Sequence, residues 1–236
     1  TQPSNGTVTV NADGTVTYTH DGSATSSDSF TYTIADNDGA TSNSATVSLS
    51  VSEVSLAFES DDFNDTSLDS FWSFIDPLND GSYTLTGTGT PDAYLELSVP
   101  GGHDMWEGSR EAVRVMQTAT NENFEIESKF ASQISQDFQI QGILVEQDAQ
   151  NWLRFDTYQQ SGQLYVFAAV TSNGNSKSKI RVPVDAGAAQ YLRVTREGET
   201  WTLSYSADGS SWNTAGNFNH ALTVNEVGPF AGNAGN

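Results

Sequence analysis

The chain has 236 residues, no cysteine, and 30 acidic against 9 basic residues, for a formal net charge of −21. This length allows one large β domain and a smaller one, and the lack of cysteine excludes disulfides and thiolate zinc sites. So acidic a chain is not expected to bind nucleic acid, because phosphates demand a basic surface, and no apolar run is long enough to predict membrane insertion.

Residues 1–53 predict a small β domain. Period-two alternation indicates four short strands, at 6–10, 15–19, 29–34 and 45–51. Asn, Asp and Gly residues supply the turns between them. The expected inward residues are Phe30, Tyr32 and Ile34. Four strands make about half of an immunoglobulin-like sandwich, which needs about seven.

The same segment resembles the cadherin-like repeats of large bacterial surface proteins. The likeness is carried by Asn5-Gly-Thr-Val-Thr-Val10, Asp13-Gly-Thr-Val-Thr-Tyr18, Asp28-Ser-Phe-Thr-Tyr-Thr-Ile34 and Asp36-Asn-Asp-Gly39. It covers the C-terminal half of such a repeat, without the half that supplies an acidic Ca²⁺ motif in that family. The resemblance implies an extracellular location, secreted or at the cell surface, and neighbouring domains in a longer parent chain.

Residues 54–236 predict a second, larger domain that is also all β. Aromatic residues become frequent, and no segment has a convincing helical period. We therefore expect a two-sheet jelly roll, with no helix longer than two turns between residues 110 and 206. The predicted strands are 82–86, 94–99, 113–117, 124–130, 138–146, 152–158, 164–170, 178–182, 191–197 and 200–206.

One predicted strand places Trp152, Arg154, Asp156 and Tyr158 on a single face. An indole, a guanidinium, a carboxylate and a phenol can together stack on a sugar and bind its hydroxyls. The alternative is that the face lies under a loop and its charges pair with one another. The other candidate ligand-binding residues are His103, Asp104, Trp106, Arg114, Gln117, Gln141 and Glu146.

His103 also has two interpretations. It could join Asp104 and Trp106 in a loop at the rim of a binding face. The alternative, which we favour, is that Trp106 fixes the loop to the core while His103 pairs with Asp104. A zinc site is not expected, because the three histidines are far apart and no carboxylate has a suitable spacing.

The densest cluster of oxygen ligands comprises Asp61, Asp62, Asn64 and Asp65. Calcium prefers several hard oxygen ligands, so this cluster predicts at most one or two structural Ca²⁺ ions as a cofactor. The alternative is an acidic turn that only keeps the surface solvated.

The larger region resembles a concanavalin A-like jelly-roll module, similar to the accessory domain at the C-terminus of family-43 glycosidases. The resemblance is carried in order by Asp62-Phe63 with Trp72, His103-Asp-Met-Trp106, Arg114-Val-Met-Gln117, Phe124-Glu-Ile-Glu-Ser-Lys-Phe130, Gln141-Gly-Ile-Leu-Val-Glu-Gln-Asp148, Asn151-Trp-Leu-Arg-Phe-Asp156, Tyr191-Leu-Arg-Val-Thr-Arg196, Trp201-Thr-Leu-Ser-Tyr-Ser-Ala-Asp-Gly209 and Val227-Gly-Pro-Phe-Ala-Gly232. In that superfamily a structural Ca²⁺ often bridges an early and a late strand.

The superfamily contains lectins, glucanases, adhesion modules and accessory domains, so the fold alone does not decide the function. Its glucanases commonly carry Glu-x-Asp-x-x-Glu on one strand, and this chain has no such triplet. We therefore expect a non-catalytic extracellular module that binds a polysaccharide or glycan, or serves adhesion. The alternatives are a structural spacer without a ligand and a glycoside hydrolase of the glucanase type.

Overall fold

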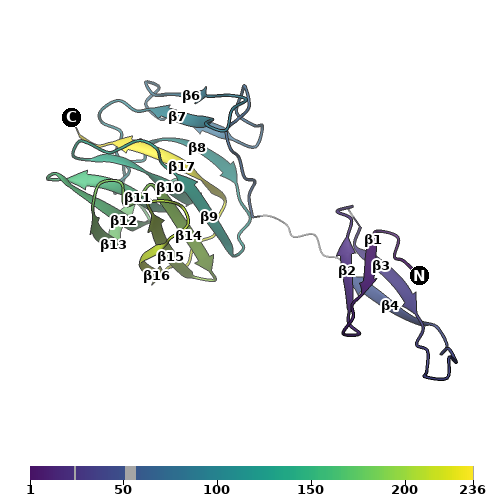
Figure 1. Ribbon diagram of the computed structural model, residues 1–236. Coiled ribbons are helices and arrows are strands. Elements are labelled where there is room, and N and C mark those ends of the chain that lie inside the picture. The colour runs from purple at the N-terminus through teal and green to yellow at the C-terminus, as the bar shows by residue number, and fades with distance from the viewer. Residues whose placement is uncertain (24, 51–56, 236) are drawn as a thin grey trace. The chain divides into compact units, whose positions relative to one another are not determined.

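The computed structural model describes residues 1–23, 25–50 and 57–235, and over these residues the protein is all β, with 17 strands and no helix (Figure 1). The predicted fold class is therefore confirmed, including the absence of a helix between residues 110 and 206. The chain divides into two compact units, Thr1–Ser55 and Leu56–Asn236. The domain boundary expected between residues 53 and 54 lies outside the described residues.

The first unit consists of two antiparallel hairpins, β1 (Gly6–Val10) with β2 (Val16–His20) and β3 (Ser27–Tyr32) with β4 (Ala45–Ser50). Asp28 ties the two hairpins together, because its carboxylate accepts hydrogen bonds from the backbone nitrogens of Ser4 and Asn5 and from the hydroxyl of Tyr18.

The predicted core of the first unit is only partly right. Phe30 is buried, but Tyr32 and Ile34 are 46% and 64% exposed. Both residues lie on the same side of the chain as Phe30, Tyr32 at the end of β3 and Ile34 just beyond it. None of the strands described in this unit covers them there.

The second unit contains a seven-stranded and a four-stranded antiparallel sheet, with a separate hairpin of β6 and β7. The larger sheet has the order β13-β12-β11-β10-β17-β8-β5, and the smaller has the order β16-β15-β14-β9. The strands are β5 (Ser73–Ile75), β6 (Ser82–Thr86), β7 (Tyr94–Ser98), β8 (Val113–Thr118), β9 (Phe124–Lys129), β10 (Gln139–Asp148), β11 (Asn151–Gln160), β12 (Gln163–Ser172), β13 (Asn175–Val184), β14 (Tyr191–Glu197), β15 (Thr200–Ser206), β16 (Asn213–Asn219) and β17 (Glu226–Asn233).

Three of these strands, β5, β16 and β17, are absent from the sequence prediction. Strand β17 lies between β10 and β8 in the middle of the larger sheet, although it contains Pro229, and proline normally argues against a central strand. It pairs with β10 without interruption, whereas its pairing with β8 skips Gly228 and Pro229. Pro229 has no amide hydrogen to donate, and the strand pairing is interrupted at this residue only toward β8.

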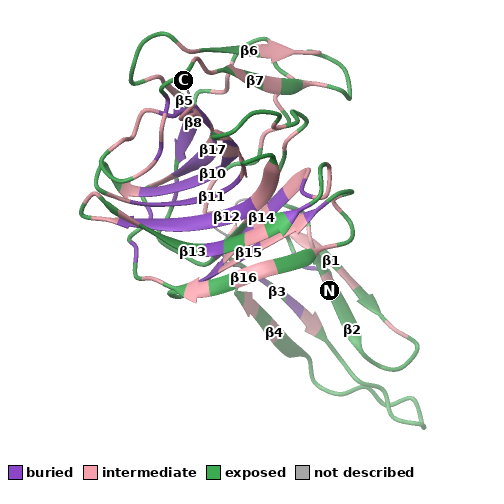
Figure 2. Ribbon diagram, turned by 90° about the vertical axis from the view of Figure 1, so that its left-hand side faces the viewer, coloured by how far each residue is buried: buried purple, intermediate pink, exposed green. Residues whose placement is uncertain are grey.

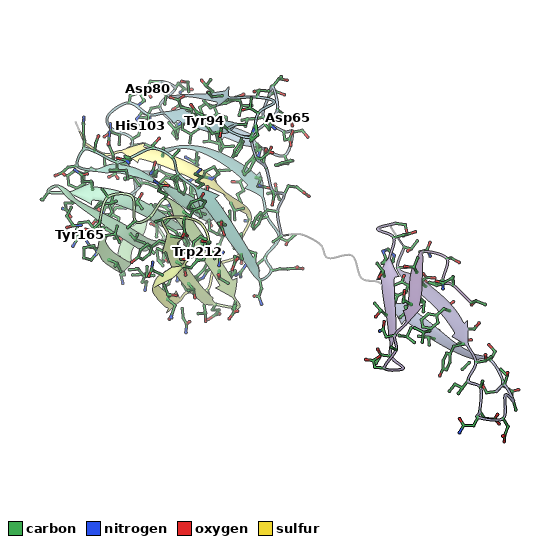
Figure 3. All side chains as sticks on the ribbon, viewed as in Figure 1. Asp65, Asp80, Tyr94, His103, Tyr165 and Trp212 are labelled. Carbon is green, nitrogen blue, oxygen red and sulfur yellow. The ribbon has the colours of Figure 1, made fainter. Side chains whose placement is uncertain are left out.

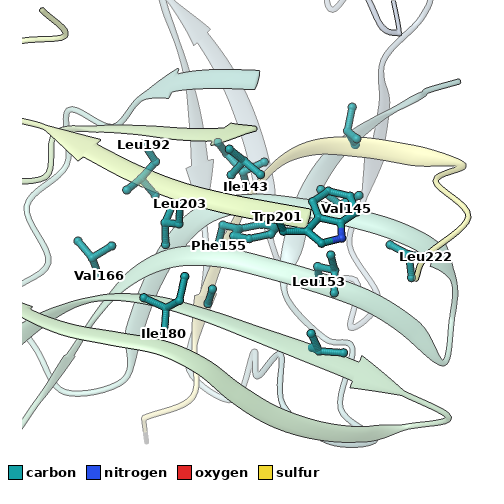
Figure 4. Close-up of a cluster of buried hydrophobic side chains, with 14 of the residues drawn as sticks. Ile143, Val145, Leu153, Phe155, Val166, Ile180, Leu192, Trp201, Leu203 and Leu222 are labelled. Carbon is teal, nitrogen blue, oxygen red and sulfur yellow. The ribbon is translucent and has the colours of Figure 1, made fainter. Parts of the chain in front are cut away.

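The main hydrophobic core lies between the two sheets. Trp201 and Leu203 of the smaller sheet pack with Phe155, Leu153 and Val145 of the larger one, and all five are fully buried (Figure 4). Removing one such large side chain from water stabilises a fold by about 1.5–3 kcal/mol. Alternation then turns every second residue of the larger sheet away from this core.

We call this other side of the seven-stranded sheet the far face. Burial continues there, and long stretches of β10 and β11 are buried on both faces (Figure 2). The cover is the segment 99–112 between β7 and β8, which packs on the sheet through Met105 and Ala112. Met105 of that segment is fully buried against a second cluster that includes Leu144, Trp152 and Phe230. The covering segment decides which residues of the far face reach solvent.

Candidate functional site

The strand face singled out in the sequence lies on the far face, but its centre is closed. Trp152, Arg154 and Asp156 are only 1%, 4% and 0% exposed. Arg154 donates through Nε and Nη2 to both carboxylate oxygens of Asp156, at 2.7 and 3.1 Å, and through Nη1 to the carbonyl of Met105 at 2.8 Å. Burial raises the pKa of Asp156, and the guanidinium opposes that shift. These three side chains cannot touch a glycan directly, which corrects the open-face interpretation for them.

A second buried charge group lies at the other end of the same face. Glu146 accepts a hydrogen bond from Nε of Arg110 at 2.9 Å and a shorter one from Nη2. Arg114 lies 3.5 Å from the same carboxylate and donates to the carbonyl of Ala112. Burial lowers the pKa of Arg114. Arg114 and Glu146 are about 1% exposed; the carboxylate of Glu146 is held by Arg110, whereas Nε of Arg114 makes no hydrogen bond.

Gln117 and Gln141 do not belong to this group, because alternation along β8 and β10 turns them to the opposite side of the sheet. Gln117 is buried and exchanges two hydrogen bonds with the backbone of Glu59. Gln141 donates to the carbonyl of Ser132. Both amides therefore bind the backbone of neighbouring loops. They do not face the same side of the sheet as Arg154 and Asp156, so the ligand-facing role expected for them is wrong.

The part of the far face that solvent reaches is aromatic. We call the partly exposed side chains of Trp106, Tyr158 and Tyr165, with the exposed Arg181 and the partly exposed Gln160 beside them, the aromatic platform. The rings of Tyr158 and Tyr165 stack with centroids 5.4 Å apart and planes 24° apart. Arg181 lies over the Tyr165 ring, 3.6 Å from its centroid.

Hydrogen bonds fix the guanidinium of the platform. Nε of Arg181 donates to the hydroxyl of Tyr158 at 2.7 Å, and Nη2 donates to Oε1 of Gln160 at 3.0 Å. The bond to Tyr158 raises the pKa of Arg181, so the group stays cationic. The indole of Trp106 continues the surface through Phe167, 6.2 Å away between ring centroids. The platform thus combines aromatic rings with hydrogen-bonding groups, and the guanidinium of Arg181 covers one face of the Tyr165 ring.

Of the residues proposed from the sequence, only Tyr158 and Trp106 belong to the platform. The position of Tyr165 could have been predicted from the sequence. Ser161-Gly162 forms a two-residue hairpin turn with both φ angles positive, and such a turn places Tyr165 opposite Tyr158 on the neighbouring strand. Arg181 had no such signal. The pairing of β12 with β13 shifts register by one residue between Ala168 and Ala169, and beyond this shift Arg181 lies opposite Phe167 on the far face.

The predicted metal cluster forms an acidic pocket lined by Ser60, Asp61, Asp62, Asp65 and Asp69. Burial and the negative charges of its neighbours raise the pKa of Asp69, a residue absent from the prediction. Asp61 already accepts hydrogen bonds from Nε1 of Trp72 and the amide of Phe63. Asn64 does not line the pocket and binds the amide of Gly89 instead. Calcium at this pocket stays a prediction.

His103 is fully buried and does not pair with Asp104, whose carboxylate accepts the amide of Met105. Its backbone forms an isolated bridge with Asn233, the last residue of β17, and its imidazole faces Asp76 and Asp80. The expected pairing is wrong because this bridge turns the imidazole toward the turn between β5 and β6. Figure 3 labels His103 and Asp80 at this place and Tyr165 on the platform.

Comparison with known proteins agrees with this architecture. Residues 88–234 match the family described as "Protein of unknown function (DUF1349)", and residues 1–53 match the bacterial cadherin-like domain. Both resemblances stated from the sequence are therefore confirmed. No curated protein matches the chain.

Several solved structures share the fold. A mutant GH43 protein of Bacillus licheniformis is 17% identical with a TM-score of 0.59, over 98% of this chain and 43% of that one. The xylan β-1,4-xylosidase of Bacillus halodurans is 14% identical with a TM-score of 0.53, over 97% and 50%. The xyloglucan PUL protein GH43B of Bacteroides ovatus is 17% identical with a TM-score of 0.57, over 97% and 43%. The chain spans half or less of each, and such identities show the fold alone.

In the described part of the chain, no helix could cross a membrane.

Proposed function

We propose, from the premise that the chain belongs to the DUF1349 family, that its jelly-roll unit is a non-catalytic carbohydrate-binding module of an extracellular protein. The observation that carries the proposal is the aromatic platform. Sugars are bound when aromatic rings meet the apolar face of a pyranose while nearby polar groups bind its hydroxyls. Tyr158, Tyr165 and Trp106 supply the rings, and Arg181 and Gln160 supply the polar groups.

The geometry favours binding over catalysis. Glycoside hydrolysis needs two carboxylic acids that reach both sides of the scissile bond. The far face carries Glu146 and Asp156, and each is buried and held by an arginine. Neither carboxylate can approach a substrate laid on the platform, which supports a binding role.

Plant xylans are the first ligands to test, because the structurally similar proteins include an enzyme described as a xylan β-1,4-xylosidase. Affinity electrophoresis in gels with arabinoxylan, and then in gels with the non-xylan polysaccharides xyloglucan and galactan, should retard the wild-type chain in at least one gel. Tyr165→Ala should reduce the affinity by about tenfold or more, which corresponds to about 1.4 kcal/mol of binding free energy.

The chain offers a matched control for this experiment. Arg193 lies over the ring of Trp212, 3.8 Å from its centroid, on the outer side of the smaller sheet. Trp212→Ala removes an equivalent aromatic stack at a different place and should leave retardation unchanged. Equal losses in Tyr165→Ala and Trp212→Ala would argue against a platform-specific site.

One observation favours a second function, a structural spacer without a ligand. Two charged pairs on the far face, Arg154 with Asp156 and Arg110 with Glu146, bind each other and need no external partner. If no polysaccharide retards the wild-type chain and both aromatic variants behave alike, the spacer interpretation replaces the lectin-like one.

A further inference from the structure

The turn between β5 and β6 meets the segment that covers the far face at a cluster of three metal-ligand side chains. Asp76 and Asp80 come from the turn, and His103 comes from the covering segment. One ligand atom of each lies within 4.8 Å of the other two. The zinc site judged absent from sequence spacing is therefore supplied by the fold, which brings both carboxylates to His103 from more than twenty residues upstream.

The hydrogen bonding of His103 assigns its tautomer. Nδ1 lies 3.1 Å from the carbonyl oxygen of Pro100, which can only accept, so we assign the proton to Nδ1. The neutral imidazole then leaves the lone pair of Nε2 free beside the two carboxylates. A histidine that donates its other nitrogen to a carbonyl has the orientation of histidines that bind metals in proteins.

Two atoms of the cluster are buried without a partner. Nε2 of His103 lies 3.0 Å from Oδ1 of Asp80 and 3.8 Å from Oδ1 of Asp76. Nε2 of His103 and Oδ1 of Asp76 make no hydrogen bond with any of the described residues. The side chain of His103 is fully buried and that of Asp76 is 8% exposed. Buried polar atoms without partners are costly and rare in native folds.

The remaining atoms of the turn are arranged to hold the cluster. Oδ2 of Asp76 accepts the amide of Gly81 at 2.8 Å, which leaves Oδ1 free to face His103. A Cβ at Gly81 would lie 2.6 Å from Cγ2 of Val113, so glycine lets the turn rest against β8. The side chain of Asp80 is half exposed and leaves one side of the cluster open to water.

We propose that His103, Asp76 and Asp80 bind one divalent transition-metal ion, with zinc as the expected ion. Metal–ligand bonds of about 2.0–2.2 Å at tetrahedral angles separate two ligand atoms by about 3.3–3.6 Å, and the two histidine–carboxylate distances of 3.0 and 3.8 Å bracket that range. An imidazole suits zinc better than it suits calcium or magnesium, and two carboxylates neutralise its charge.

The ion would join two segments of the second unit. It would link the turn at residues 76–81 to the covering segment 99–112, which also carries Met105 and Trp106. Because binding to the folded state alone stabilises it, zinc should raise the melting temperature. This site is separate from the acidic pocket at Asp61–Asp69 and does not depend on the glycan-binding proposal.

Zinc titration of the full, chelator-treated chain by calorimetry tests the proposal, with millimolar Ca²⁺ present to occupy the acidic pocket. We expect one Zn²⁺ per chain. Asp80→Asn should weaken binding by at least about tenfold, because it removes a ligand charge from a half-exposed position that the fold tolerates. Asp92→Asn is the matched control in the exposed segment between β6 and β7, and it should bind as the wild type does.

A second measurement needs no variant. In nitrogen NMR spectra of the wild-type chain, Zn²⁺ should shift Nε2 of His103 while its Nδ1 keeps the proton. Absence of zinc binding, equal affinities of the wild type and Asp80→Asn, or an imidazole protonated on both nitrogens and insensitive to Zn²⁺ would each overturn the proposal.

Discussion

Replacing Arg154 by alanine should destabilise the jelly-roll unit strongly. The guanidinium is 4% exposed and donates two hydrogen bonds to Asp156, which is fully buried, and one to the carbonyl of Met105. Removing it leaves a buried carboxylate without its counter-charge and a carbonyl without its donor. Breaking a buried pair in this way costs about 3–5 kcal/mol of unfolding free energy.

Urea unfolding followed by tryptophan fluorescence measures this cost. All five tryptophans lie beyond residue 71, so the signal reports the second unit alone. Arg193→Ala is the control, because its pairs with Glu125 and Glu127 are exposed and should contribute at most about 1 kcal/mol.

A double variant separates the pair from general packing. Replacing both Arg154 and Asp156 by leucine removes both charges at once, and should recover most of the stability that Arg154→Ala loses. A loss below about 1 kcal/mol for Arg154→Ala would refute the account of the far face as a buried ionic network.

Three further predictions concern other parts of the second unit. Excess chelator should lower the melting temperature of the chain and added Ca²⁺ should restore it if the acidic pocket binds calcium, whereas an unchanged melting curve would remove calcium from the account. The pKa of Asp69 is raised in the folded state, so its contribution to folding stability is present when the carboxyl group is protonated and is lost as the pH rises through that pKa. In the absence of calcium, the stability of the wild type should therefore fall with rising pH over this range. Asp69→Asn should make that fall smaller, and thermal melts at a series of pH values measure it. Gly228→Ala should prevent folding or cost several kcal/mol, because a Cβ there would collide with the carbonyl oxygen of Val115, and a native circular dichroism spectrum and melting curve would contradict this expectation.

The sequence predicted most of the strands, because alternation and Gly-containing turns are local signals. Phe124–Lys129, Tyr191–Glu197 and Thr200–Ser206 form close to where they were expected. Strand β17 was missed because Pro229 argues locally against a strand, whereas its place between β10 and β8 is decided by tertiary pairing.

The site was harder to predict than the fold. Alternation correctly grouped Trp152, Arg154, Asp156 and Tyr158 on one face, but it could not show that the segment 99–112 lies over three of them. The partners of His103 come from a distant turn, and no spacing along the chain reveals such a contact.

An NMR titration tests the proposed binding surface most directly. It follows the indole and guanidinium signals of the chain while a soluble xylan or galactan oligosaccharide is added. The account predicts that Nε1 of Trp106 and Nε of Arg181 shift with the ligand, while the indole signals of Trp152, Trp201 and Trp212 stay in place. The first two lie on the platform, and the other three are buried or on the smaller sheet. Shifts confined to Trp212, or no shift with any of the polysaccharide classes tested, would contradict a glycan site on the platform.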